Sequence, residues 1–214
     1  MSNITSTPQE SIQADIHALV REILEGVYIK VLINKIDIRE DLVNDSTSVS
    51  CELLLGEKKY KIEGTGRGVV DALFTSILKC LKKEYVSLEN ITLEDFVVTV
   101  DLNKFWRKKS KTDAKVEAVV FINNRAGKTF LFRHTCRSMI SASISCVTKM
   151  VEYYINSEKA VVHLKTCIAD SIKRNRGDLT ERFTSQLSEL VRNMSYEKTI
   201  NKLERSEMHE EGTN

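Results

Sequence analysis

The chain has 214 residues, which is long enough for one sizeable hydrophobic core or for a core with helical appendages. Hydrophobic residues make up 42% and charged residues 29%, as in an ordinary globular protein, and the net charge of +2 is too small to make nucleic acid or an anionic membrane the expected partner. The first residues lack the basic start and apolar run of a signal peptide, and no apolar run is long enough to span a bilayer, so we expect a soluble, cytoplasmic protein.

The first part of the chain predicts one helix followed by three strands. Residues 9–25 place isoleucine, leucine and valine at helical spacing, and Gly26 follows as a stop signal. The segment 28–38 is rich in β-branched residues and predicts a strand. Two further strands, over 49–55 and 58–63, are expected to form a hairpin.

A glycine-rich turn and an amphipathic helix come next, within residues 60–85. Gly64, Gly66 and Gly68 remove side chains at every second position, which suits positive φ or a close approach between backbones. The apolar positions that follow recur at spacings of three and four, and they are Val70, Leu73, Ile77 and Leu81. This spacing predicts a helix with one buried face.

The same plan returns in the second half, where strands are expected over 91–102, 114–122 and 128–133 before a second helix. Sliding residues 130–155 onto 60–85 without a gap aligns Arg137 with Arg67, Ile140 with Val70 and Ala142 with Ala72. The chain is therefore predicted to be an α+β protein of two β-β-β-α units, with a mainly antiparallel sheet and its helices on one face.

These patterns divide the chain into three regions. We expect an N-terminal helix over 1–26, the α+β domain over 27–156 with halves 27–86 and 87–156, and a helical tail over 157–214. The tail shows helical periodicity on both sides of Gly177 and predicts a helical hairpin, which either covers the core or holds another subunit.

The run LLLGEKKYKIEGTGRGVVDALFTSIL, which contains the first turn, resembles part of a known domain. That domain is the regulatory, or dimerisation, domain of 2-isopropylmalate synthase and citramalate synthase, and the run resembles its first half. That family typically carries G-x-G-x-G-P-V-D-A after a hairpin. This chain keeps Gly64, Gly66, Gly68, Val70, Asp71 and Ala72 of that run. Arg67 stands where asparagine is common, and Val69 replaces the proline.

The second turn keeps less of the family's pattern. Ala142 and Ser143 match its A-S pair, but Ser138 stands in place of the aspartate and Cys136 in place of the leading serine. Since the resemblance covers roughly residues 28–156, it implies that this region is the regulatory domain.

The resemblance implies a function in leucine biosynthesis and its control. In that family the domain follows a catalytic TIM barrel, forms dimers and binds leucine or isoleucine as a feedback inhibitor at the dimer interface, near the two helix starts. The barrel is absent here, and the four histidines, His17, His134, His163 and His209, form no HxH pair of the kind that holds the catalytic metal. We therefore expect a non-catalytic homodimer that takes no metal or cofactor.

Physical reasoning points to the same turns as a ligand site. Free N–H groups at a helix start favour an anion such as an amino-acid carboxylate, and the equivalent Arg67 and Arg137 add charge-assisted hydrogen bonds. The candidate effector-binding residues are Gly64, Gly66, Arg67, Gly68, Val70, Asp71, Ala72, Cys136, Arg137, Ser138 and Ala142. An effector bound there would act on a partner protein through the C-terminal helices.

Three other interpretations stay open. A structural adaptor would keep the dimer fold without the ligand. Cys136 sits before a helix beside Arg133, His134 and Arg137, conditions that lower the pKa of a thiol and allow redox or nucleophilic chemistry with His134 as the base. A basic run over 107–111 next to Phe105 and Trp106 suits nucleic-acid contact, but the small net charge favours a solvated loop.

The five cysteines, widely spaced and without a CxxC pair, match neither a disulfide framework nor a zinc site.

Overall fold

The structure is a computed structural model that describes residues 8–100 and 115–194, so the basic run over 107–111 lies outside the described residues. The chain divides into two compact units, one formed by Ile29–Tyr154 and the other by the segments before and after it. We describe each unit by itself.

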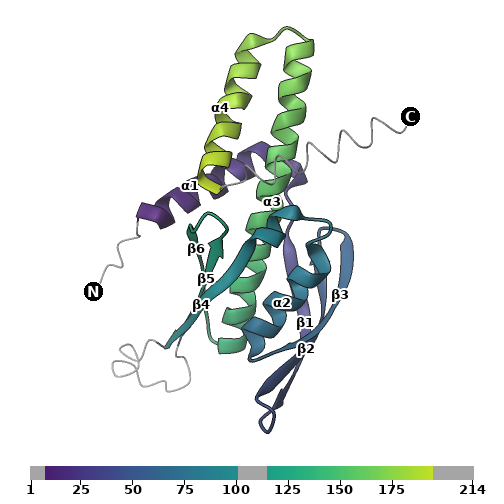
Figure 1. Cartoon of the computed structure of the whole chain (residues 1–214), viewed down its shortest axis with the longest axis vertical. Helices are drawn as coiled ribbons and strands as arrows, with labels where there is room; N and C mark the ends of the chain where they lie inside the picture. Colours follow the sequence, from purple (N-terminus) through teal and green to yellow (C-terminus); the bar gives the residue numbers. More distant parts are fainter. Residues whose placement is uncertain (1–7, 101–114, 195–214) are drawn as a thin grey trace. The chain divides into compact units, whose positions relative to one another are not determined.

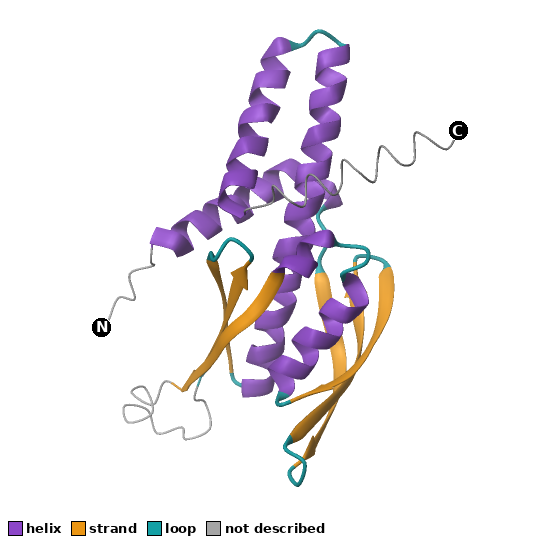
Figure 2. Ribbon diagram, in the orientation of Figure 1, coloured by secondary structure: helices purple, strands orange, loops and turns teal. Residues whose placement is uncertain are grey.

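The larger unit contains two three-stranded antiparallel sheets (Figure 2). The first sheet has the order β1-β2-β3, from strands β1 (Val31–Asp41), β2 (Ser46–Leu55) and β3 (Lys58–Gly66). The second has the order β4-β5-β6, from strands β4 (Ile91–Val100), β5 (Val116–Asn124) and β6 (Thr129–Cys136). The first strand of each sheet carries a register shift, after Ile33 in β1 and after Leu93 in β4. The two halves thus share order, pairing and irregularity, which confirms the predicted α+β duplication.

Helix α2 (Val69–Leu81) covers the first sheet. Alternate side chains of β2 point toward it and are buried, while Leu73, Ile77 and Leu81 are fully buried on the helix. The period of two on the strand and the spacing of three and four on the helix therefore bury the same core.

Two glycines of β3 let the strand and helix approach closely. A Cβ on Gly64 would lie 1.9 Å from Ser76 Oγ, and one on Gly66 would lie 2.5 Å from the backbone nitrogen of Ala72. Position 66 therefore requires glycine, because any Cβ there would collide with the backbone of α2. Sequence reasoning left open whether these glycines serve positive φ or close approach, and the structure selects close approach at both.

Helix α3 (Met139–Lys173) covers the second sheet with its first half. The inward rings of β6, Phe130 and Phe132, pack at centroid separations of 5.6 to 6.3 Å against Tyr153 and Tyr154 of the helix. The carboxylate of Glu152 also accepts a hydrogen bond of 3.0 Å from the backbone N–H of Val31 in the first sheet. Helix α3 therefore joins the two halves instead of covering a single common sheet.

Helix α3 also continues further than its sequence pattern suggested. The sequence predicts a separate helical tail from residue 157, but the helix runs unbroken for 35 residues and passes through that boundary. The segment 139–173 contains neither glycine nor proline, so nothing local stops it. One helix therefore belongs to both units.

The smaller unit consists of α1 (Pro8–Leu24), the second half of α3 and α4 (Gly177–Met194) (Figure 1). A short 3₁₀ turn, η1 (Glu25–Val27), follows α1. His17 Nε2 lies 3.0 Å from Tyr28 Oη, and the guanidinium of Arg21 lies 5.0 Å from the centre of the same ring. An ion pair of 3.4 Å between Arg182 and Glu22 links α4 to α1. These contacts confirm the predicted N-terminal helix and C-terminal helices.

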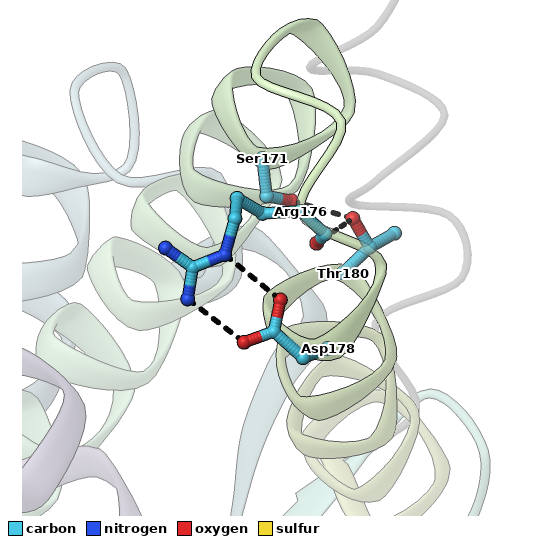
Figure 3. A network of polar contacts seen from close by, with 4 residues as sticks. All are labelled: Ser171, Arg176, Asp178 and Thr180. Atoms are coloured by element: carbon cyan, nitrogen blue, oxygen red, sulfur yellow. Dashed lines mark hydrogen bonds and ion pairs between the residues drawn. The ribbon is translucent and has the colours of Figure 1, made fainter.

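A polar network closes the turn between α3 and α4 (Figure 3). The guanidinium of Arg176 donates two hydrogen bonds to the carboxylate of Asp178, at 3.0 and 2.8 Å. Ser171 Oγ lies 2.8 Å from Thr180 Oγ1, which donates to the carbonyl oxygen of Arg176. Asn175 adopts a positive φ of 53° here, the left-handed conformation that ends many helices.

A carboxylate beyond the end of α2 predicts an acid-sensitive contribution to stability. Lys58 Nζ and Tyr60 Oη each donate to Glu84 at 2.6 Å, and these bonds, Lys58 first, lower the pKa of Glu84. Because the folded pKa lies below the unfolded one, the stabilisation is present at neutral pH and is lost as the pH falls below the ordinary value of 4.5. We expect Glu84→Gln to lower the urea midpoint at neutral pH and to leave it closer to that of the wild type in acid.

The matched control is Glu52→Gln, which removes an exposed carboxylate with a single ion pair of 3.3 Å to Lys59. Exposed pairs of this kind contribute little. A Glu84→Gln deficit that is the same at neutral and acid pH would contradict the assignment.

Candidate effector-binding cleft

The two helix starts of the larger unit meet at one cavity of about 350 Å³. Residues 67–71 line it from the first turn and the start of α2, and Met139, Ile140 and Ser143 line it from the start of α3. Leu93 and Phe96 of β4 complete the wall. The duplication therefore brings its two equivalent turns together within one chain, around a largely apolar space.

The first turn leaves the start of α2 without a side-chain cap. Gly68 occupies the N-cap position and offers no side chain, while Asp71 Oδ2 accepts a hydrogen bond of 3.0 Å from the backbone N–H of Arg67. The Asp71 carboxylate therefore holds the turn that precedes the helix. The first N–H groups of α2 remain uncapped by any side chain, a situation that favours an anion.

The second turn differs in its chemistry. Ser138 Oγ accepts a hydrogen bond of 3.2 Å from the backbone N–H of Ser141, so a side chain caps the start of α3. The thiol of Cys136 donates to the carbonyl oxygen of Ser138 at 3.1 Å. Of the two helix starts, that of α2 is the better anion site.

The apolar residues of the second turn form the mouth of the cavity. Met139 and Ile140 are 56% and 44% exposed, although both begin a helix whose next turns are buried. As an apolar residue on the predicted second helix, Met139 is expected by default to belong to the core. The structure instead places it at the surface, at the mouth of the cavity.

The structure separates the predicted site residues into two groups. Arg67, Gly68, Val70 and Asp71 line the cavity. The other predicted residues are not among those that line it, and they are Gly64, Gly66, Ala72, Cys136, Arg137, Ser138 and Ala142. Ala72 and Ala142 are fully buried and serve the packing of the helices. A role of any of these predicted site residues in effector binding stays a prediction.

Sequence reasoning missed the two cavity residues on β4. Leu93 and Phe96 are half-buried, and alternation along the strand predicted only that one face would be covered. The register shift between Leu93 and Asp95 allows residues 93 and 96, which are three apart, to line the same cavity. No sequence signal marks a bulge of this kind.

Thiol and metal chemistry find little support around the second turn. The only hydrogen bond described for the Cys136 thiol goes to a backbone carbonyl rather than to His134. Burial and the charge of Lys149 lower the pKa of His134, and burial raises the pKa of Cys146 to about 11. Across the described residues, no cluster of three or more histidine, cysteine, aspartate or glutamate side chains is placed to hold a metal ion.

The larger unit is thus a duplicated β-β-β-α fold whose two turns meet at a largely apolar cavity. The chain matches the LeuA allosteric (dimerisation) domain over residues 10–155, more than half of its length, and it therefore belongs to that family. A comparison with curated proteins finds no match. Within the described ranges, no helix combines the length and apolar character needed to cross a membrane.

Proposed function

We propose that the chain is a homodimerising regulatory module whose cavity binds a branched-chain amino acid, and that binding alters how the dimer acts on a partner protein. Membership of the allosteric, dimerising family supports self-association and regulation. The cavity between the helix starts is the observation that supports a ligand.

The walls of the cavity suit one short aliphatic side chain. Leu93 and Phe96 of β4 and Ile140 of α3 offer apolar surface, and a volume of about 350 Å³ lies at the small end of ligand pockets, which span roughly 300–1,000 Å³. A leucine or isoleucine side chain buried there would gain roughly 1.5–3 kcal/mol from leaving water.

The polar end of the ligand would lie against the first turn. An α-carboxylate suits the uncapped start of α2, where the helix dipole and the nearby Arg67 both favour negative charge. Asp71 lines the same cavity, and its negatively charged carboxylate would attract the positively charged α-ammonium group of an amino acid. An amino acid thus offers the three features that the cavity matches: an anion, a cation and an aliphatic side chain.

The effector would act on the dimer only through different affinities for two arrangements of it. We place the signal path through α3, because this one helix starts at the cavity and continues into the smaller unit. A partner protein held by the C-terminal helices would then sense the ligand. A cytoplasmic role beside an enzyme of leucine biosynthesis fits this proposal.

Titration calorimetry with leucine, isoleucine and valine tests the effector. We expect binding of at least one of them, abolished or weakened by at least about tenfold in Ile140→Asp, which places a charge at the mouth of the cavity. The matched control is Val97→Asp, since Val97 is 41% exposed on the other face of the second sheet. Absence of heat with all three amino acids, together with no rise in melting temperature, would contradict the proposal.

One observation favours a second candidate, an adaptor that dimerises without a ligand. The start of α3 is already capped by Ser138, so one of the two turns offers less to an anion than its counterpart. An adaptor would dimerise normally and give no heat in the same calorimetry.

A further inference from the structure

The hairpin between β1 and β2 ends in a tip, residues 41–45, that presents two aliphatic side chains to solvent. Leu42 and Val43 are 88% and 93% exposed, more than any other large hydrophobic residue that the structure describes. Lone exposed apolar residues are common on proteins, but two adjacent ones at the end of a projecting hairpin form a small apolar surface.

The tip is held in shape by its own hydrogen bonds. Asp41 Oδ1 accepts from the backbone N–H groups of Val43 and Asn44 at 3.0 and 3.1 Å, and Asp41 Oδ2 accepts from the Asn44 side chain at 2.8 Å. These bonds, with the side chain of Asn44 first, lower the pKa of Asp41. A turn fixed in this way presents Leu42 and Val43 with little further loss of conformational entropy on binding.

The tip lies at the same end of the larger unit as the cavity. The last pair between β2 and β3 joins Thr47 to Gly66, and Arg67 at the cavity follows directly. Beyond that pair β1 and β2 continue without β3, so Leu42, two residues past the level of Gly66, lies roughly 7 Å further on at about 3.3 Å per residue. Figure 1 shows the hairpin extending beyond the starts of α2 and α3.

The two surfaces also match in charge. The hairpin end carries the carboxylates of Glu40, Asp41 and Asp45. The cavity is bordered by Arg67 and Asp71, whose charges offset each other, and Arg137, which precedes the exposed residues at its mouth, adds a further positive charge. The acidic, apolar tip and the apolar mouth with its net positive charge are therefore complementary.

We infer that the hairpin tip of one copy docks at the cavity mouth of a second copy, with Leu42 and Val43 against Met139 and Ile140. The contact rests on the proposed self-association. A two-fold axis at this end makes it reciprocal, so each copy gives a tip and receives one. The acidic residues of the tip then approach the arginines of the mouth, and a ligand within the cavity is enclosed by the partner.

Sedimentation of tip variants tests this contact. We expect Leu42→Ser with Val43→Ser to weaken dimerisation at least about 100-fold, since both aliphatic side chains leave a buried contact. Folding should be unaffected, because both positions are exposed. The control is Leu32→Ser, which changes a 51% exposed leucine on β1 away from the tip.

Cross-linking provides a second readout. A mixture of Leu42→Cys and Met139→Cys chains should form a disulfide-linked dimer on mild oxidation, with positions 42 and 139 joined in the mass spectrum, whereas each variant alone should show only the wild-type background. No such link, or a tip variant that dimerises like the wild type, overturns the contact and leaves the effector proposal intact. A monomeric wild-type chain overturns the contact and the self-association together, while an absence of heat with amino acids bears only on the effector.

Discussion

Gly66→Ala should lower the free energy of unfolding by about 1–3 kcal/mol, the range typical of overpacking. The added Cβ would lie 2.5 Å from the backbone nitrogen of Ala72 and 2.6 Å from Asp71 Oδ2. Neither atom can rotate away freely, because one belongs to the helix backbone and the other accepts the N–H of Arg67. The start of α2 must therefore move, and we expect amino-acid binding to weaken as well.

Gly68→Ala is the matched control two residues further on. Nothing lies within 4 Å of a Cβ at Gly68, and its φ of −174° is an extended conformation open to any residue. We expect unchanged or slightly increased stability, since alanine restricts the unfolded chain. Urea unfolding of both variants decides the matter, and equal losses at positions 66 and 68 would show that the close approach is not what requires glycine.

Phe132→Ala should cost about 3–5 kcal/mol of unfolding free energy, the usual effect of removing a buried aromatic ring. Phe132 is buried on β6 and packs edge-on against Tyr153 at 5.6 Å and tilted against Tyr154 at 6.3 Å. These rings attach α3 to the second sheet, so their loss also loosens the helix that starts at the cavity.

Leu131→Ala serves as the comparison, because Leu131 lies on the opposite face of the same strand and is only half-buried. Urea unfolding should show a clearly smaller loss for it. If both variants unfolded with the same loss, the aromatic cluster would not be the main contact between α3 and the second sheet.

The two turns show how a duplicated sequence can give unequal sites. At the positions where the first turn has Gly64 and Gly66, the second has His134 and Cys136. A side chain at those positions of the first turn would collide with α2. The second turn lacks these glycines, and at its helix start Ser138 accepts a hydrogen bond from the backbone N–H of Ser141, whereas no side chain caps the start of α2.

Much of the fold was predictable because it follows from local rules. Alternation in β2 and β5, helical spacing in α2, and the gap-free repeat gave the duplicated α+β class and the N- and C-terminal helices. The continuation of α3 through residue 157 was not predicted, since a change of apolar pattern does not stop a helix that lacks glycine and proline.

The sequence by itself determined the order of the elements, the duplication and the positions of the two turns before α2 and α3. These features depend on periodicity and on residues close together in the chain. Only the tertiary structure decided that the turns meet at a cavity, that Leu93 and Phe96 complete it, and that Leu42 and Val43 project beyond it. The physical reason is that a strand pattern gives the face of a residue but not its register, and that a bulge in β4 and the length of a hairpin set distances between residues far apart in sequence.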